Sequence, residues 1–101
     1  MNSRNLGFIG GGRVTRIILE GLRRAGALNA RVVVSDPSEP TLARLKQRLP
    51  EIELIAGDNT VAAAQDLVFL AVHPPAITDV AREINGSLPD HALVVSLAPK
   101  F

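Results

Sequence analysis

Three consecutive glycines, Gly10 to Gly12, constrain the fold of this chain more than any other feature of its sequence. They follow a short apolar run at residues 5–9 and precede a segment in which apolar residues recur at helical spacing from Val14 to Ala25. Glycine adopts backbone conformations that side chains forbid, so the run predicts a tight turn between a buried strand and an amphipathic helix.

The same alternation of short apolar runs and amphipathic segments continues along the chain. Further strands are expected at residues 31–35, 52–55, 67–72 and 93–97, with helical segments between them. Continuously apolar strands are typical of a parallel sheet that is covered by helices on both faces. The predicted fold class is therefore α/β, a doubly wound Rossmann-like sheet with strand order 3-2-1-4-5. We expect one domain over residues 1–101, truncated after the fifth strand.

Composition excludes several classes of function. The 101 residues hold 11 Lys and Arg against 10 Asp and Glu, and three Phe with no Tyr or Trp, which argues against a nucleic-acid partner. The absence of cysteine and the presence of only two histidines argue against a metal site. No apolar run approaches the roughly 20 residues that span a bilayer, and no signal peptide is evident, so we expect a cytoplasmic protein without a membrane partner.

The glycine run also carries a chemical pattern. Residues 10–15 read G-x-G-x-x-T between the predicted strand and helix. In a dinucleotide-binding turn the first glycine permits the tight bend, and the second lets a pyrophosphate approach the backbone N–H groups at the helix start. Thr15 departs from the Gly or Ala that normally follows, so a purely structural turn stays an alternative.

Two charged residues bear on this hypothesis. Arg13 lies in the first helical turn, where a cation opposes the helix dipole unless an anion is bound there; a solvated side chain is the alternative. Asp36 follows Thr15 by 21 residues, close to the spacing of the acid that binds the ribose 2′-OH of NAD. It could equally be a turn residue, and Ser35 and Ser38 could hold a 2′-phosphate, so NAD and NADP both stay open.

Several segments, in register over nearly the whole chain, match a known pattern: Gly7–Gly12, Ile18–Leu22, Val34–Ser38, Asp58–Asn59, Phe69–Pro74 and Val94–Ala98. They resemble the nucleotide-binding domain of pyrroline-5-carboxylate reductase, which reduces a cyclic imine to proline. The resemblance implies an NAD(P) cofactor, with Asn59 near it. It also implies a separate helical domain that forms the dimer and most of the imine site, so this chain alone is not expected to be catalytic.

The sequence departs from that family at positions where the resemblance implies contact with the ligand. Arg13 stands where Asn is usual, His73 where Lys is usual, and Ala98-Pro99-Lys100 replaces a small Ala-Gly turn. These departures leave two alternatives open, a domain like that of deazaflavin-dependent NADP reductases and a stand-alone nucleotide-binding module without catalysis. A homodimer could form through the helical domain or through the edge of the fifth strand.

The unusual residues all follow predicted strands, and in a doubly wound sheet ligands bind at the carboxyl ends of the strands. We therefore expect adenosine near residues 35–38, pyrophosphate over residues 11–14, and nicotinamide toward residues 71–74 and 98. No catalytic residue is assigned, and His73 is interpreted as a strand-end residue. The candidate cofactor-binding residues are Gly10, Gly11, Gly12, Arg13, Val14, Ser35, Asp36, Ser38, Asn59, Ala71, Val72, His73, Pro74 and Ala98.

Overall fold

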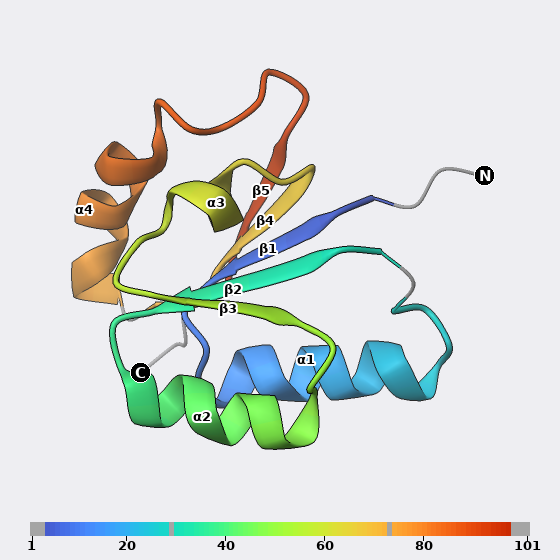
Figure 1. Cartoon of the computed structure of the whole chain (residues 1–101). Coiled ribbons are helices and arrows are strands. Elements are labelled where there is room, and N and C mark those ends of the chain that lie inside the picture. Colours follow the sequence, from blue (N-terminus) through green and yellow to red (C-terminus); the bar gives the residue numbers. More distant parts are fainter. Residues whose placement is uncertain (1–3, 29, 73, 98–101) are drawn as a thin grey trace.

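The computed structural model describes residues 4–28, 30–72 and 74–97. Five parallel strands form one sheet in the order β3-β2-β1-β4-β5, which confirms the predicted fold class and strand order (Figure 1). The elements in chain order are β1 (Leu6–Ile9), α1 (Arg13–Arg24), β2 (Val32–Asp36), α2 (Glu39–Arg48), β3 (Glu53–Ala56), α3 (Thr60–Ala63), β4 (Leu67–Leu70), α4 (Pro74–Ile84) and β5 (Leu93–Ser96).

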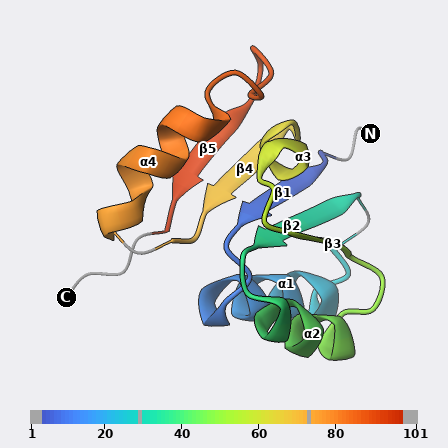
Figure 2. The ribbon, with the colours of Figure 1, turned by 60° about the vertical axis from the view of Figure 1, so that its left-hand side comes forward.

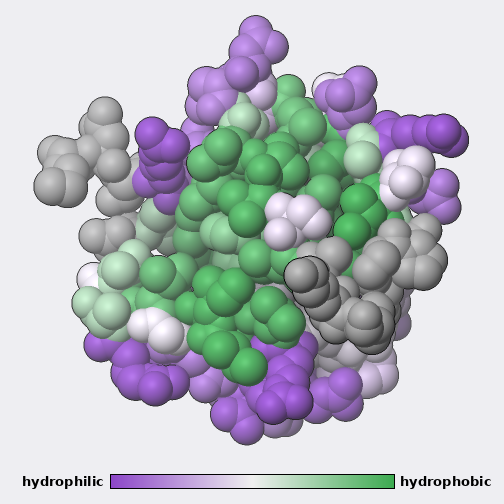
Figure 3. Space-filling model, turned by 180° about the vertical axis from the view of Figure 1, so that it is seen from behind, coloured by the Kyte–Doolittle hydropathy of each residue, from purple (hydrophilic) through white to green (hydrophobic). Residues whose placement is uncertain are grey.

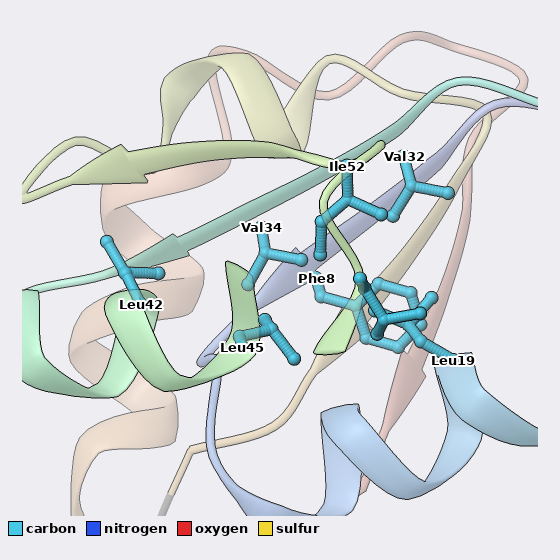
Figure 4. Close-up of a cluster of buried hydrophobic side chains, with 8 residues drawn as sticks. Phe8, Leu19, Val32, Val34, Leu42, Leu45 and Ile52 are labelled. Atoms are coloured by element: carbon cyan, nitrogen blue, oxygen red, sulfur yellow. The ribbon is translucent and has the colours of Figure 1, made fainter. Parts of the chain in front are cut away.

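Helices cover the sheet from both sides. Helices α1 and α2 lie on one side, and α3 and α4 lie on the other (Figures 1 and 2). Strand β2 is buried on both faces, as its run of three valines predicts. Each layer of helices closes its own apolar cluster. The cluster under α1 and α2 (Figure 4) consists of Phe8, Leu19, Val32, Val34, Leu42, Leu45, Leu49 and Ile52.

The register of the central strands places their carboxyl ends side by side. Ile9, the last residue of β1, lies opposite Ser35 of β2 and Leu70 of β4. Phe8 and Phe69 stack across the same pair of strands, with ring centroids 4.5 Å apart. The turn after β1 therefore begins between the ends of two neighbouring strands, where the order of the strands reverses.

Strand β4 is shorter than its apolar run suggests. The run continues to Val72, but the strand ends at Leu70, and the backbone N–H of Ala71 still donates to the carbonyl oxygen of Ile9 at 2.8 Å. Ala71 and Val72 then leave the sheet toward α4. Hydrophobicity alone could not separate Val72 from the strand, because its side chain still packs against the apolar cluster that contains Leu70.

A close approach of backbones fixes α3 against β1. A Cβ atom added at Gly7 would lie 1.8 Å from the carbonyl oxygen of Ala62, so only glycine fits here. Ala62 and Ala63 are fully buried, and they belong to the second apolar cluster, beneath α3 and α4. The small side chains of α3 thus let this short helix lie directly on the central strand.

The molecule keeps some large apolar side chains exposed. Viewed from behind, hydrophobic residues gather over a broad area (Figure 3). Among the described residues, the exposed large hydrophobic side chains belong to α1 and β5: Val14, Ile17, Leu93 and Val94. Ile17 and Leu93 are each 55% exposed. No helix in the described part of the chain is both long and apolar enough to cross a membrane.

Candidate functional site

The candidate site is a cavity of about 540 Å³ at the carboxyl ends of β1, β2 and β4. Seven of the predicted residues line it: Gly10, Gly12, Ser35, Asp36, Asn59, Ala71 and Val72. They come from four separate segments of the chain, which the parallel sheet brings to one edge. The remaining lining residues are Ile9, Pro37, Gly57, Ala76, Val80 and Glu83.

The first glycine of the turn is required by geometry. Gly10 has a φ of 108°, and a Cβ atom there would lie 2.3 Å from the carbonyl oxygen of Ala71. Its backbone N–H donates to the carbonyl oxygen of Ser35 at 2.8 Å. The chain therefore leaves β1 in a conformation that only glycine adopts without strain, pressed between the ends of the two flanking strands.

Gly12 differs from Gly10, because none of the described residues crowds it. A Cβ atom added at Gly12 would have no neighbour within 4 Å in the described part of the chain, and its φ of −79° suits any residue. A glycine that neither backbone strain nor packing requires leaves space for something else to approach. This is the position at which a dinucleotide-binding turn admits the pyrophosphate.

The N-terminus of α1 is open to an anion. Gly12 caps the helix without a side-chain hydrogen bond, and the first turn contains no acidic residue. The first N–H groups of a helix have no partner within the helix and carry partial positive charge. A pyrophosphate seated over Gly12 would accept hydrogen bonds from these groups.

Thr15, the departure from the usual motif, has a structural explanation. Its side chain is fully buried, and its hydroxyl donates to the carbonyl oxygen of Gly10 at 2.6 Å. The hydroxyl thus satisfies a carbonyl group within the turn that a Gly or Ala at this position would leave without this partner. Thr15 ties the beginning of α1 to the first glycine.

Asp36 connects the end of β2 with two backbone N–H groups. One carboxylate oxygen accepts from Gly11 at 2.8 Å, and the other accepts from Ser38 at 2.8 Å. Both alternatives for this residue are therefore compatible with its position, since it shapes a turn and also lines the main cavity. Each carboxylate oxygen has a further lone pair with which to accept from a ribose hydroxyl.

Three polar side chains that line the cavity are linked by hydrogen bonds. Ser35 is fully buried and its hydroxyl donates to the side-chain oxygen of Asn59 at 2.6 Å. The amide nitrogen of Asn59 donates to a carboxylate oxygen of Glu83 on α4 at 3.1 Å. These bonds hold the Asn59 side chain in one orientation, with α4 as the far anchor.

Arg13 and Val14 lie on the other side of the glycine turn. They line a separate cavity of about 190 Å³ together with Gly12, Thr15, Ala71, Val72 and Leu97. Val14 is 42% exposed. Ala71 and Val72 therefore border two cavities, one on each side of the turn, as expected for residues at the point where the strand order reverses.

The remaining predicted residues fall outside these cavities or outside the described part. Ser38 caps α2, where its hydroxyl oxygen accepts from the backbone N–H of Thr41 at 3.3 Å. Gly11 lines a third cavity, of about 240 Å³, beside α2. His73, Ala98 and the side chain of Pro74 lie outside the described residues.

The sequence analysis did not identify Glu83, nor three residues that line the 240 Å³ cavity beside α2: Arg16, Thr41 and Arg44. Nothing in the sequence distinguishes Glu83 from other exposed helical acids. The others left a signal, because Arg13 and Arg16, like Thr41 and Arg44, are three residues apart and so share a helix face.

Comparison with known proteins shows the family of this chain. Residues 5–100 match the family described as NADP oxidoreductase, coenzyme F420-dependent. The pyrroline-5-carboxylate reductase of Escherichia coli K12 is 35% identical over 96 residues, which are 94% of this chain and 35% of that protein. The enzyme of the same name from Methanosarcina acetivorans is 27% identical over 97% of this chain and 36% of its own length. The chain thus spans about a third of the length of these curated relatives.

Solved structures also include a similar pyrroline-5-carboxylate reductase. A pyrroline-5-carboxylate reductase from Coxiella burnetii superposes with a TM-score of 0.85 at 35% identity, covering 96% of this chain and 36% of that one. Prephenate dehydrogenase from A. aeolicus has a TM-score of 0.80 over 97% of this chain and 34% of its own, but at 18% identity it shares only the fold. This chain belongs to the family of NADP oxidoreductases described as coenzyme F420-dependent, as a Rossmann-like NAD(P)-binding domain similar to that of pyrroline-5-carboxylate reductases.

Proposed function

We propose that this chain is the cofactor-binding part of a reductase that transfers a hydride from NAD(P)H to a cyclic imine, as in proline biosynthesis. The observation that carries the proposal is the open space at Gly12, beside N–H groups of α1 that no side chain caps. Together with the 540 Å³ cavity at the strand ends, it provides a cradle for a pyrophosphate and room for an adenosine.

The proposal gives each group of residues a position along the cofactor. Adenosine would lie near Ser35, Asp36, Ser38 and Asn59. The pyrophosphate would lie over residues 10–14. Nicotinamide would lie toward residues 71–74 and Ala98. In support, the first and last of these regions meet at the glycine turn, because Gly12 borders the main cavity and the cavity beside Val72.

The chemistry of such a reductase belongs mainly to its cofactor, which supplies the hydride when bound. The residues of this chain would bind the cofactor, orient it and exclude water from one of its faces. Among the described residues, the cavity beside Ala71, Val72 and Leu97 is lined by no carboxylate and no histidine, and its one charged side chain is the guanidinium of Arg13. We therefore propose that residues 1–101 act as one cofactor-binding unit and that the imine is bound by another part of the protein.

The exposed apolar side chains of α1 and β5 support a contact with another folded unit. Because Leu93 and Val94 lie on an edge strand, we propose that a homodimer forms through this edge or through a helical domain elsewhere in the protein. Light scattering of the wild type and of Leu93→Lys tests the first route. An unchanged dimer mass in the variant would leave only the second.

The deazaflavin-dependent alternative is supported by the description of the family. The imine reductase is favoured because the pyrroline-5-carboxylate reductase from Coxiella burnetii matches 96% of this chain in both fold and sequence. Both proposals need the cofactor site, and they differ only in the molecule that accepts the hydride.

Calorimetric titration of the chain with NADH and with NADPH tests the site directly. We expect micromolar binding of at least one of them, and Gly12→Val should weaken that binding by at least about tenfold because its side chain occupies the pyrophosphate position. Gly21→Ala, in the middle of α1, is the matched control, since a Cβ atom there also meets nothing within 4 Å. Binding of neither cofactor by the folded chain would contradict the proposal.

A further inference from the structure

The connection between α4 and β5 begins with an asparagine followed by a glycine, Asn85 and Gly86 (Figure 1). Both residues are exposed. They form the middle of a tight turn, which the backbone N–H of Ser87 closes by donating to the carbonyl oxygen of Ile84 at 2.8 Å. The amide carbon of an asparagine side chain lies only a few bonds from the next backbone nitrogen. The surroundings of such a pair decide whether the two groups react with each other.

Neither backbone conformation nor space requires a glycine at position 86. The glycines with a positive φ are Gly10, Gly26 and Gly57, and Gly86 is not among them. A Cβ atom added at Gly86 would meet nothing within 4 Å in the described part of the chain. What glycine does provide here is open access to its nitrogen, because no side chain shields that nitrogen from the residue before it.

The two reacting groups are also unengaged. No hydrogen bond joins the N–H of Gly86, or the side-chain amide of Asn85, to any residue within the described ranges. The Asn85 side chain can therefore rotate toward the nitrogen of Gly86 without breaking a bond to a described residue.

Asn5, at the amino end of the sheet, lacks this freedom. Its side-chain oxygen accepts from the backbone N–H of Arg31 at 3.3 Å. The nitrogen that follows it belongs to Leu6 and donates to the carbonyl oxygen of Arg31 at 2.8 Å. Both groups would have to leave their partners before they could react.

Asn59, in the main cavity, is held in the same way. Its side chain is fixed between Ser35 and Glu83. The nitrogen that follows it belongs to Thr60 and donates to a carboxylate oxygen of Asp58 at 2.9 Å. Among the three asparagines within the described ranges, the structure thus leaves both groups available at Asn85 alone.

We propose that Asn85 is a site of spontaneous covalent modification, at which asparagine is converted into aspartate and isoaspartate. The nitrogen of Gly86 loses its proton and forms a bond with the side-chain amide carbon of Asn85, and the amide group leaves as ammonia. Water then opens the resulting succinimide ring. Cleavage of the new bond gives aspartate, and cleavage of the bond between the same nitrogen and the main-chain carbonyl carbon gives isoaspartate. The net change is uptake of water and loss of ammonia, with no oxidation or reduction.

The modification would alter the end of α4 and so the wall of the main cavity. Ile84, directly before Asn85, is buried in the second apolar cluster, and Val80 and Glu83 of the same helix line the main cavity. Both products add a negative charge at the end of the helix that is already the negative end of its dipole. Isoaspartate also adds an atom to the main chain directly after Ile84. The inference does not depend on which ligand the cavity binds.

The test follows each asparagine by mass spectrometry. The purified chain would be incubated at mildly alkaline pH, which favours the deprotonated nitrogen, and digested at intervals. The peptide that contains Asn85 should gain the mass difference between an oxygen atom and an NH group, and part of it should become a substrate for an isoaspartyl methyltransferase. The peptides that contain Asn5 and Asn59 should keep their mass. An Asn85 peptide that converts no faster than these two would overturn the inference.

Gly86→Ala tests the attacking nitrogen. The rate of conversion of Asn85 should fall by at least about tenfold, which is the effect of a steric cost of about 1.4 kcal/mol in the transition state. The added Cβ atom has room, so the variant should fold, and circular dichroism would establish that it does. An unchanged rate in this variant would overturn the inference.

Thr60→Gly is the matched control for the surroundings. It places the same pair of residue types at Asn59, where the side chain and the following N–H are both hydrogen-bonded. In this variant Asn59 should react at least about tenfold more slowly than Asn85 in the same molecule, because its hydrogen bonds must break first. Equal rates at the two positions would show that the sequence pair alone decides, and would overturn the inference from the structure.

Discussion

The carboxylate of Asp36 accepts a hydrogen bond from the backbone N–H of Gly11 at 2.8 Å, and so ties the end of β2 to the turn that follows β1. The other oxygen of the same carboxylate holds the N–H of Ser38 at the start of α2. One side chain thus joins the first two strand–helix connections. The shape of the proposed phosphate cradle depends on a residue that belongs to neither β1 nor α1.

We predict that Asp36→Ala lowers both stability and cofactor affinity. Two backbone N–H groups would lose a charged acceptor, which should lower the free energy of unfolding by about 1–3 kcal/mol. NADH affinity should fall as well, because the turn loses its support and the ribose loses an acceptor. Urea denaturation and calorimetric titration measure the two effects. An Asp36→Ala protein with wild-type stability and NADH affinity would show that these bonds are dispensable.

Asp36→Asn separates charge from geometry at the same position. The amide oxygen can still accept from one N–H group, but the negative charge beside the proposed position of the adenosine ribose is gone, and this charge would repel a 2′-phosphate. The affinity ratio of NADPH to NADH should therefore rise. If the ratio fell instead, the support that Asp36 gives to the glycine turn would favour NADPH more than the negative charge of Asp36 disfavours its 2′-phosphate.

Gly10→Ala should destabilise the fold and not merely the site. The added Cβ atom would meet the carbonyl oxygen of Ala71 at 2.3 Å, and the φ of 108° is unfavourable for alanine. Backbone strain of this kind costs about 1–3 kcal/mol before the clash is counted. Chemical denaturation of Gly10→Ala beside Gly21→Ala, which has no such contact, measures the difference. Equal stability of the two variants would contradict the structure of the turn.

Thr15→Val should cost stability through a single buried hydrogen bond. The isosteric valine fills the same space but cannot donate to the carbonyl oxygen of Gly10, and the expected loss is about 1–3 kcal/mol. Thr15→Ser keeps the hydroxyl and loses only a methyl group, so it should retain the bond. If the valine variant were as stable as the wild type, the hydroxyl would have no part in holding the turn.

The acid stability of the chain should depend on Asp66, at the amino end of the sheet. The backbone N–H of Asn5 and then the side chain of His91 hold the pKa of Asp66 below its usual range. A depressed carboxyl pKa contributes stability above the unfolded pKa of about 4, and that stability is lost as the pH falls through the lower folded value. The melting temperature of the wild type should therefore fall more steeply below pH 4 than that of Asp66→Asn.

Asp79→Asn is the control for this pH series. Asp79 is an exposed acid of α4 for which the described residues provide no ion pair. Its variant should follow the wild-type curve at every pH. Identical acid profiles for the Asp66 variant and the wild type would show that the bonds to Asn5 and His91 do not contribute to stability.

The sequence was most informative where one physical requirement acts alone. The run of valines predicted a strand buried on both faces, and Gly10 predicted a tight turn. Both predictions are confirmed, and the structure adds that the φ of Gly10 is positive. Thr15 looked like a defect in the motif, because its hydrogen bond to Gly10 depends on the fold of the turn and has no signal in spacing or hydropathy.

The cavity of about 240 Å³ between α1 and α2 shows why other residues around the glycine turn could not be predicted. Arg13 and Arg44 are 31 positions apart, and each alone looks like a solvated helical cation. Only the packing of α1 beside α2 brings them to one hollow. The link from Ser35 through Asn59 to Glu83 likewise joins three elements whose order in the chain gives no hint of contact.

Because all five strands run in the same direction, the sheet has two chemically distinct ends. The glycine turn and Asp36 lie at one end, while Asp66, His91 and the Arg31–Glu53 ion pair lie at the other. Strands of four residues separate these ends by roughly 13 Å, and changes that far apart without shared partners usually combine additively. The acid tolerance of this domain could thus be adjusted at one end by mutation while its choice of nucleotide is altered independently at the other.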